Sequence, residues 1–272
     1  MTYIIAEVGV NHQGVPSIAR NYIEALHDVG ADAVKFQMFK ADELEPPGER
    51  RGMLKNLEFG IGVMMDLKAV CEAIGIDFLC TPFDQQSLLW LAGMGPTPMQ
   101  YMKLGSGAIH NGSLISSASK CGIPLIVSTG TLNYQEINTL VKKTEASVVM
   151  HCISAYPTQP EDMHLGTIPW LVRKYNKRAI GLSDHSLSTV IPAAAVAMGA
   201  TFIEKHVTFD RSWPSPDHHM SLDMGEFSEM IDGIRDVEKA ISGDIPVYER
   251  PACEDETKAI IEERNKHMKS MA

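Results

Sequence analysis

The sequence predicts a single (β/α)8 barrel, also called a TIM barrel, which is an α/β fold of eight parallel strands that alternate with helices. Its 272 residues are many for one ordinary domain but normal for such a barrel. Eight short apolar runs rich in β-formers recur along the chain, and a helical pattern follows each of them. A doubly wound open sheet is the alternative, and the absence of GxGxxG after the first run weakens its dinucleotide-binding version.

The predicted strands are the eight apolar runs themselves. They cover residues 3–8, 33–37, 77–80, 101–104, 125–128, 148–151, 179–183 and 201–205. The helical patterns between them cover residues 16–29, 60–75, 84–93, 111–121, 134–144, 161–175, 187–198 and 225–242. We therefore expect residues 1–245 to form the barrel domain and residues 246–272 to be a polar tail that forms a short helix or a frayed end.

Local signals justify several of these helices in order. Glycines fall where four of them should stop, at positions 30, 75, 122 and 199. In the second helix, Leu67, Cys71 and Ile74 have the spacing of one buried face. Asp84 is a predicted N-cap of the third helix, and Asn133 with Glu136 predicts a capping box at the fifth.

Composition excludes several classes of function. The chain is 44% hydrophobic and 21% charged, which allows a large core. Its net charge of −10, without any basic stripe, argues against nucleic acid as a partner. The five cysteines form no CxxC pair and indicate reduced thiols in a cytoplasmic protein. The N-terminus does not resemble a signal peptide, and no apolar stretch is long enough to span a membrane.

Polar side chains follow nearly every predicted strand, at the end of a barrel where active sites form. Lys35 and Lys103 stand out because apolar neighbours flank each of them, and a buried lysine needs an anionic partner or a shifted pKa. His185 and His206 end the neighbouring seventh and eighth strands, where they could hold a divalent metal or simply hydrogen-bond without one. His151 ends the sixth strand and is expected in or near the site.

A loop stiffened by two prolines follows the last predicted strand. It brings an acid, Asp217, back over the expected barrel mouth, beside the predicted metal ligand His206.

At this point the motifs closely resemble those of the sialic acid (N-acetylneuraminate) synthases over about residues 3–245. They are "IIAEVGVNHQG", "AVKFQ", "CTPFD", "KLGSG", "STG", "HCISAYPT", "GLSDHS", "EKHVTFD" and "PDHHMS". The resemblance implies a transferase of carbohydrate biosynthesis that condenses phosphoenolpyruvate with an N-acyl hexosamine such as N-acetylmannosamine, giving a sialic-type acid and phosphate.

The resemblance also implies roles for individual residues. Glu7 and Asp217 match acids near the reacting carbons and the sugar, and His185 with His206 match manganese ligands, although Mg²⁺ or Co²⁺ would also suit. The matching substrate-binding positions are Lys35, Gln37, Thr81, Lys103, Ser106, Ser154, Tyr156 and Ser183.

The sequence departs from the family pattern in several places. Ser154 stands where the family often has asparagine, and Ala108 where it commonly has an acid. No separate C-terminal antifreeze-like domain is expected, so a homodimer partner or a separate lid protein would cover the mouth. Two alternatives stay open: another phosphoenolpyruvate–sugar synthase, and a barrel that binds a ligand without turnover. The sequence does not identify the hexosamine.

Overall fold

The computed structural model describes residues 1–95, 97–108, 110–242 and 251–270, and it confirms the predicted barrel. Its eight strands are β1 (Tyr3–Gly9), β2 (Ala33–Met38), β3 (Asp77–Pro82), β4 (Met102–Leu104), β5 (Leu125–Ser128), β6 (Val148–Cys152), β7 (Ala179–Asp184) and β8 (Phe202–Thr208). They are parallel and lie in sequence order, and β1 also pairs with β8. In that closing pair, Tyr3 lies opposite Phe202 and Glu7 opposite His206.

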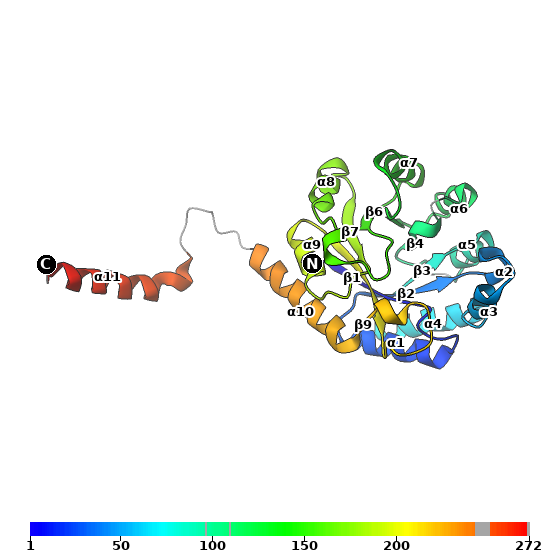
Figure 1. Cartoon of the computed structure of the whole chain (residues 1–272), viewed down its shortest axis with the longest axis horizontal. Helices are drawn as coiled ribbons and strands as arrows, with labels where there is room; N and C mark the ends of the chain where they lie inside the picture. The colour runs from blue at the N-terminus through cyan, green and yellow to red at the C-terminus, as the bar shows by residue number, and fades with distance from the viewer. Residues whose placement is uncertain (96, 109, 243–250, 271–272) are drawn as a thin grey trace. The chain divides into compact units, whose positions relative to one another are not determined.

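Helices surround the strands, as Figure 1 shows. The predicted ones correspond to α1 (Pro16–Asp28), α4 (Ile61–Ile74), α5 (Gln85–Ala92), α6 (Gly112–Ala118), α7 (Tyr134–Thr144), α8 (Thr167–Lys174), α9 (Ile191–Ala197) and α10 (Met224–Ile241). The Asp84 cap and the Asn133–Glu136 capping box are both formed. The helix predicted for residues 161–175 is too long, because a 3₁₀ turn at Pro160–Asp162 precedes α8.

Three short helices and strands of the barrel unit were not predicted. Two short helices, α2 (Ala41–Leu44) and α3 (Glu49–Lys55), follow β2, and a two-residue strand, β9 (Leu222–Asp223), pairs with β8. These three are too short to show a helical or strand period, which is why the sequence pattern does not indicate them. The tail contains α11 (Asp255–Ser270), a helix as expected for one of its two predicted forms.

The core has two layers because side chains of a strand alternate between its faces. On β1, Ile4 packs outward in the large layer beneath the helices, and Ile5 packs inside the barrel. The inner layer is the smaller one and is made by Ile5, Ala33, Leu79, Ile126, Val148, Met150 and Phe202. Towards the C-terminal ends of the strands, the inward positions turn polar, and there the candidate site begins.

The chain divides into two compact units, Met1–Glu238 and Lys239–Ala272. The first contains the barrel. In the second, the side chains of α11 that the structure describes are exposed, including Ile260, Ile261 and Met268. Residues 243–245 of the predicted barrel domain, and residues 246–250 and 271–272 of the predicted tail, lie outside the described residues. Within the described ranges, no helix combines the length and the apolar character needed to cross a membrane.

Candidate active site

The C-terminal mouth of the barrel holds a small cavity of about 110 Å³ with a polar lining. Most residues predicted for the site line it, namely Glu7, Lys35, Gln37, Thr81, Lys103, Ser106, Tyr156, Ser183, His185 and His206. Asp217 lines an adjoining cavity that shares Gln37, Tyr156 and His206 with the first. The Oγ of Ser154 would lie 2.2 Å from a Cβ added at Gly130, which places it against the turn after β5, next to Ser106 of the cavity lining. The structure therefore brings the predicted residues together.

At the centre of the mouth, one carboxylate joins both buried lysines. Each oxygen of Glu204 lies 2.6 Å from Lys103 Nζ, and Oε2 also lies 3.2 Å from Lys35 Nζ. Ser183 Oγ donates a third hydrogen bond to this carboxylate, at 2.9 Å. All four side chains are buried, so the network is shielded from water. The anionic partner expected for the lysines is thus Glu204, which was not among the predicted residues.

The charges of this network depend on one another. Burial raises the pKa of Glu204, but the ammonium groups of Lys103 and Lys35 outweigh it and hold that pKa below its usual range. Burial alone would lower the pKa of Lys35. The neighbouring Glu204 and Glu7 carboxylates outweigh this effect, so the pKa of Lys35 is raised. Burial dominates at Lys103 and lowers its pKa. With two carboxylate oxygens at 2.6 Å, Lys103 still forms a charge-assisted pair.

Hydroxyl groups line the side of the mouth next to the lysines. Lys35 Nζ donates to Thr81 Oγ1 at 3.2 Å, and Ser106 Oγ lies 3.6 Å from Cys152 Sγ. The hydroxyls of Ser128 and Ser154 are buried without a hydrogen-bond partner among the described residues. Buried hydroxyls are seldom left unsatisfied in folded proteins, so this pair of donors indicates a place for a ligand oxygen.

A glycine at the end of β1 leaves room for two acids at the mouth. Gly9 ends β1 with φ of 56°, and a Cβ there would lie 2.9 Å from Asp217 Oδ2 and 3.3 Å from Glu7 Oε1. Gln37 donates to Glu7 at 2.8 Å, and Lys35 Nζ lies 3.1 Å from the other Glu7 oxygen. Burial raises the pKa of Glu7, and burial together with the Glu7 charge raises the pKa of Asp217 to about 6.

Two imidazoles stand between the lysines and Asp217. The ring centroids of His185 and His206 are 5.6 Å apart, and the Tyr156 ring lies 4.4 Å from that of His185. The carbonyl of Ile153 lies 2.8 Å from His185 Nδ1, an arrangement that favours a proton on Nδ1 and leaves Nε2 as a ligand atom. Burial lowers the pKa of His206, which favours the neutral ring that a metal requires.

These two histidines fit a divalent metal as a site with open positions. His206 Nδ1 is buried and has no hydrogen-bond partner within the described part of the chain, as expected of a ligand atom, although Asp217 Oδ2 is 3.9 Å away. Among the described residues, no group of three or more histidine, cysteine or acidic side chains is arranged to hold a metal. Any bound ion would therefore keep positions for water or substrate.

Other polar residues at strand ends point away from the mouth. Lys205 pairs with Asp184 at 2.7 Å, and both are buried on the outer side of the wall. His151 also faces outward, where Nε2 lies 2.7 Å from the carbonyl oxygen of Met163, so the expectation that it belongs to the site is wrong. The period of two along β6 and β8 explains both results, since Cys152 and Glu204 occupy the inward positions instead.

The same period could have identified the residues that were missed. Glu204 lies two positions before His206 on β8 and therefore shares its face. Ser128 lies two positions after the inner-core residue Ile126 on β5. Both line the cavity, and neither was among the predicted site residues.

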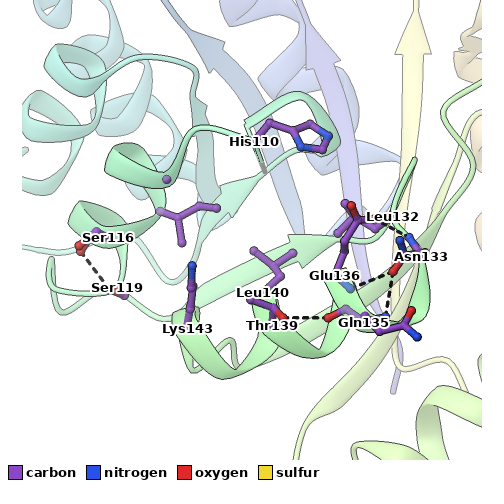
Figure 2. A pocket seen from close by; sticks show the side chains of 12 residues that line it. His110, Ser116, Ser119, Leu132, Asn133, Gln135, Glu136, Thr139, Leu140 and Lys143 are labelled. Atoms are coloured by element: carbon purple, nitrogen blue, oxygen red, sulfur yellow. Dashed lines mark hydrogen bonds between the residues drawn. The ribbon is translucent and has the colours of Figure 1, made fainter.

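Another cavity of the barrel unit is much larger than the polar mouth. A groove of about 710 Å³ lies on the outside between α6 and α7, and Figure 2 shows the side chains around it. Apolar Leu132 and Leu140 lie beside Glu136, Lys143 and the capping residue Asn133. No buried charged pair or nucleophile–base pair lines this groove, so its size alone does not make it the candidate site.

Comparison with known proteins gives a consistent result. The sequence model of the NeuB family matches residues 22–245. The N,N'-diacetyllegionaminic acid synthase of Legionella pneumophila is 35% identical, over 88% of this chain and 73% of its own length. The human N-acetylneuraminate-9-phosphate synthase is 32% identical, over 93% of this chain and 74% of its own length.

A solved structure resembles the fold closely. The crystal structure of an N-acetylneuraminic acid (sialic acid) synthetase from Leptospira borgpetersenii superimposes with a TM-score of 0.86 and 33% identity. The match covers 97% of this chain and 91% of that one.

Proposed function

Because the chain belongs to the NeuB family, we propose that it condenses phosphoenolpyruvate with an N-acyl hexosamine to a nonulosonic acid, releasing phosphate. The observation that carries the proposal is the pair of buried lysines, Lys35 and Lys103, that share Glu204 at the floor of a polar mouth. A barrel that only encloses apolar ligands would have no use for two buried ammonium groups there. The proposed partners are the two substrates, with a second copy or a separate lid protein over the mouth, in the cytoplasm.

In the proposed complex, the phosphate and carboxylate of phosphoenolpyruvate lie against the lysines and hydroxyls. Lys35, Lys103 and Thr81 are placed for charge-assisted and hydroxyl contacts. The unpartnered hydroxyls of Ser128 and Ser154 would gain acceptors. These contacts orient the enol without taking part in bond formation.

Carbon–carbon bond formation would take place beside the histidines. The C3 atom of phosphoenolpyruvate attacks the aldehyde carbon of the open-chain sugar, and C2 becomes electron-poor. A divalent metal held by His185 and His206, with Mn²⁺ the first choice, would supply Lewis acidity towards the aldehyde oxygen. Glu7 is placed to stabilise the positive charge at C2, because its buried carboxylate borders the same cavity.

Water then adds at C2, and phosphate departs by cleavage of its bond to that carbon. Asp217 is the candidate for orienting the sugar hydroxyls and for accepting the proton of the attacking water. Its pKa near 6 makes it a stronger base than an ordinary aspartate while leaving it largely ionised at neutral pH.

The test is consumption of phosphoenolpyruvate by the purified chain with a panel of N-acyl hexosamines and Mn²⁺. Phosphoenolpyruvate labelled with ¹⁸O in the bridging position should place the label in the released phosphate, because the bond between carbon and oxygen breaks. Absence of turnover with every sugar, or label retained in the organic product, would contradict the proposal.

Two pairs of variants connect the activity to the site. Lys103→Met should weaken phosphoenolpyruvate binding about a hundredfold or more, whereas Lys120→Met, at an exposed position, should leave it unchanged. His185→Ala should abolish metal-dependent turnover with the fold intact, and the exposed His27→Ala serves as its control. Full activity of the wild-type chain in excess chelator would show that the metal assignment is wrong.

A further inference from the structure

Next to the polar mouth lies a second cavity whose lining is mostly apolar. It has a volume of about 350 Å³. Its apolar side chains are Val10, Phe39, Leu44, Leu54, Phe83 and Met220. They come from the ends of β1 and β2, from α2 and α3, and from the loops after β3 and β8. A ligand that enters this cavity therefore contacts more hydrocarbon than hydrogen-bonding groups.

The cavity leads directly to the proposed reaction centre. Gln37, Tyr156 and His206 line both this cavity and the polar mouth, and Asp217 lines this one. Two of its other lining residues, Leu44 and Arg50, are exposed to solvent. If the aldehyde of the sugar lies beside His206, the remainder of its carbon chain extends into the apolar cavity towards Leu44.

The lysine and arginine side chains in and around this cavity are already paired with acids. Its one cationic lysine or arginine among the described lining residues is Arg50, which pairs with Glu45 at 2.9 Å. The neighbouring basic residues on this side are paired as well: Arg51 and Lys55 with Asp42, and Lys40 with Glu58. A phosphate group here would find Arg50 already paired with Glu45 and no uncommitted lysine or arginine among the described lining residues, so its desolvation would not be offset.

We propose, on the basis of the function proposed above, that this subsite takes an unphosphorylated 6-deoxy hexose acylated on two amino groups. The methyl at C6 and the acyl methyl groups give such a sugar three apolar substituents for walls that offer few hydrogen bonds. A hydroxymethyl group at C6 would lose its hydrogen bonds to water without gaining equivalent ones from these walls. A phosphate at C6 would lose more hydration free energy than the hydroxymethyl group.

The decisive measurement ranks three sugars with the full chain, phosphoenolpyruvate and Mn²⁺. They are 2,4-diacetamido-2,4,6-trideoxymannose, N-acetylmannosamine and N-acetylmannosamine 6-phosphate. We expect kcat/KM to fall about tenfold from the first to the second and by a further hundredfold or more to the third, following the loss of apolar contacts and the addition of charge. Equal or greater kcat/KM for the 6-phosphate would overturn the inference.

A matched pair of variants at the C-terminal end of α2 tests the charge argument. Glu45→Gln frees Arg50 and should raise kcat/KM for the 6-phosphate at least fivefold without a similar gain for the trideoxy sugar. Glu43→Gln makes the same chemical change at an exposed position outside the lining and should leave the ranking unaltered. If both variants respond alike, the Arg50–Glu45 pair does not set the specificity.

Binding separates this inference from the proposed function. Isothermal titration of each sugar into the chain loaded with phosphoenolpyruvate, without added metal, ranks the sugars in the absence of turnover. The expected order of affinity, together with no turnover of any sugar in the assay with Mn²⁺, would sustain the inference and refute the synthase activity. Turnover with the order of sugar affinities reversed would refute the inference and sustain the proposed synthase activity.

Discussion

Glu204 is the residue on which the arrangement of the mouth depends. It accepts from Lys103 and Ser183 and lies 3.2 Å from Lys35, so three side chains assigned to phosphoenolpyruvate meet at a single carboxylate. In the free protein it holds the lysines in place and offsets part of their charge. An incoming phosphate must therefore share the two ammonium groups with a carboxylate that is already there.

We expect Glu204→Ala to lower the free energy of unfolding by about 3–5 kcal/mol, because two buried ammonium groups lose their main counter-charge. Saturating phosphoenolpyruvate should restore more stability to this variant than it adds to the wild type, since it supplies the missing negative charge. Urea unfolding with and without phosphoenolpyruvate measures both effects.

Asp184→Ala is the matched control, because it removes the carboxylate partner of another buried lysine, Lys205, on the outer wall of the same strands. It should destabilise the fold as well, but its stabilisation by phosphoenolpyruvate should equal that of the wild type. An identical ligand effect in both variants would mean that Glu204 has no special relation to the anion site.

For single residues, the sequence predicted which residue types form the site better than it predicted the direction in which each side chain points. Lys35 and Lys103 were predicted as buried lysines that need an anionic partner, and their carboxylate neighbours confirm that reasoning. Which carboxylate pairs with these lysines depends on the register between strands that are far apart in the chain. No local sequence pattern encodes that register. His151 was misplaced because a strand end was treated as a single position, whereas successive residues face opposite sides of the wall.

Among the elements, the turn between β5 and α7 shapes the hydroxyl side of the mouth. Gly130 lies in this turn, and a Cβ there would come within 2.2 Å of Ser154 Oγ and 2.4 Å of Ser106 Oγ. The "STG" segment therefore needs glycine for space, since its φ is not in the left-handed region. Without a side chain at this position, both hydroxyls can face one ligand oxygen.

Gly130→Ala should raise the phosphoenolpyruvate KM at least tenfold, because the methyl group displaces one or both serine hydroxyls from the anion site. Gly112→Ala, at the start of α6, has nothing within 4 Å of the added Cβ and should behave as the wild type. Steady-state kinetics of the two variants at saturating sugar decides the point. Unchanged KM values in both would place the phosphate elsewhere in the mouth.

The eight strands and the helices that cover them were predictable because each has its own apolar pattern and several have clear caps. The short helices α2 and α3 were not, since four and seven residues around two consecutive prolines leave no period to detect. Yet Leu44, Arg50 and Leu54 of these helices line the apolar cavity. Part of the proposed sugar specificity therefore rests on elements that the sequence pattern did not indicate.

For the whole molecule, the candidate site belongs to the barrel unit. Strands β1 to β8 each contribute at least one lining residue, and α11 contributes none among those described. We expect a chain that stops after Ser242 to keep its phosphoenolpyruvate affinity and to unfold within about 0.5 kcal/mol of the full chain, because the described side chains of α11 are exposed and bury little surface. Calorimetric titration and urea unfolding of the two proteins make the comparison.

Loss of more than about 2 kcal/mol, or of phosphoenolpyruvate binding, would mean that residues 243–272 support the barrel. A rise in sugar KM alone, with phosphoenolpyruvate affinity kept, would instead assign these residues to the sugar side of the mouth.

Closure of the barrel by β1 and β8 has a consequence for synthesis of the chain in the cell. Tyr3 leaves the ribosome early, but its partner Phe202 follows 199 positions later. At ~5–20 residues per second, the β1 edge waits roughly 10–40 seconds for the strand that completes it. Throughout that interval, its backbone donors and acceptors are available to other nascent chains. Newly made barrels should therefore depend on chaperones until translation has passed β8.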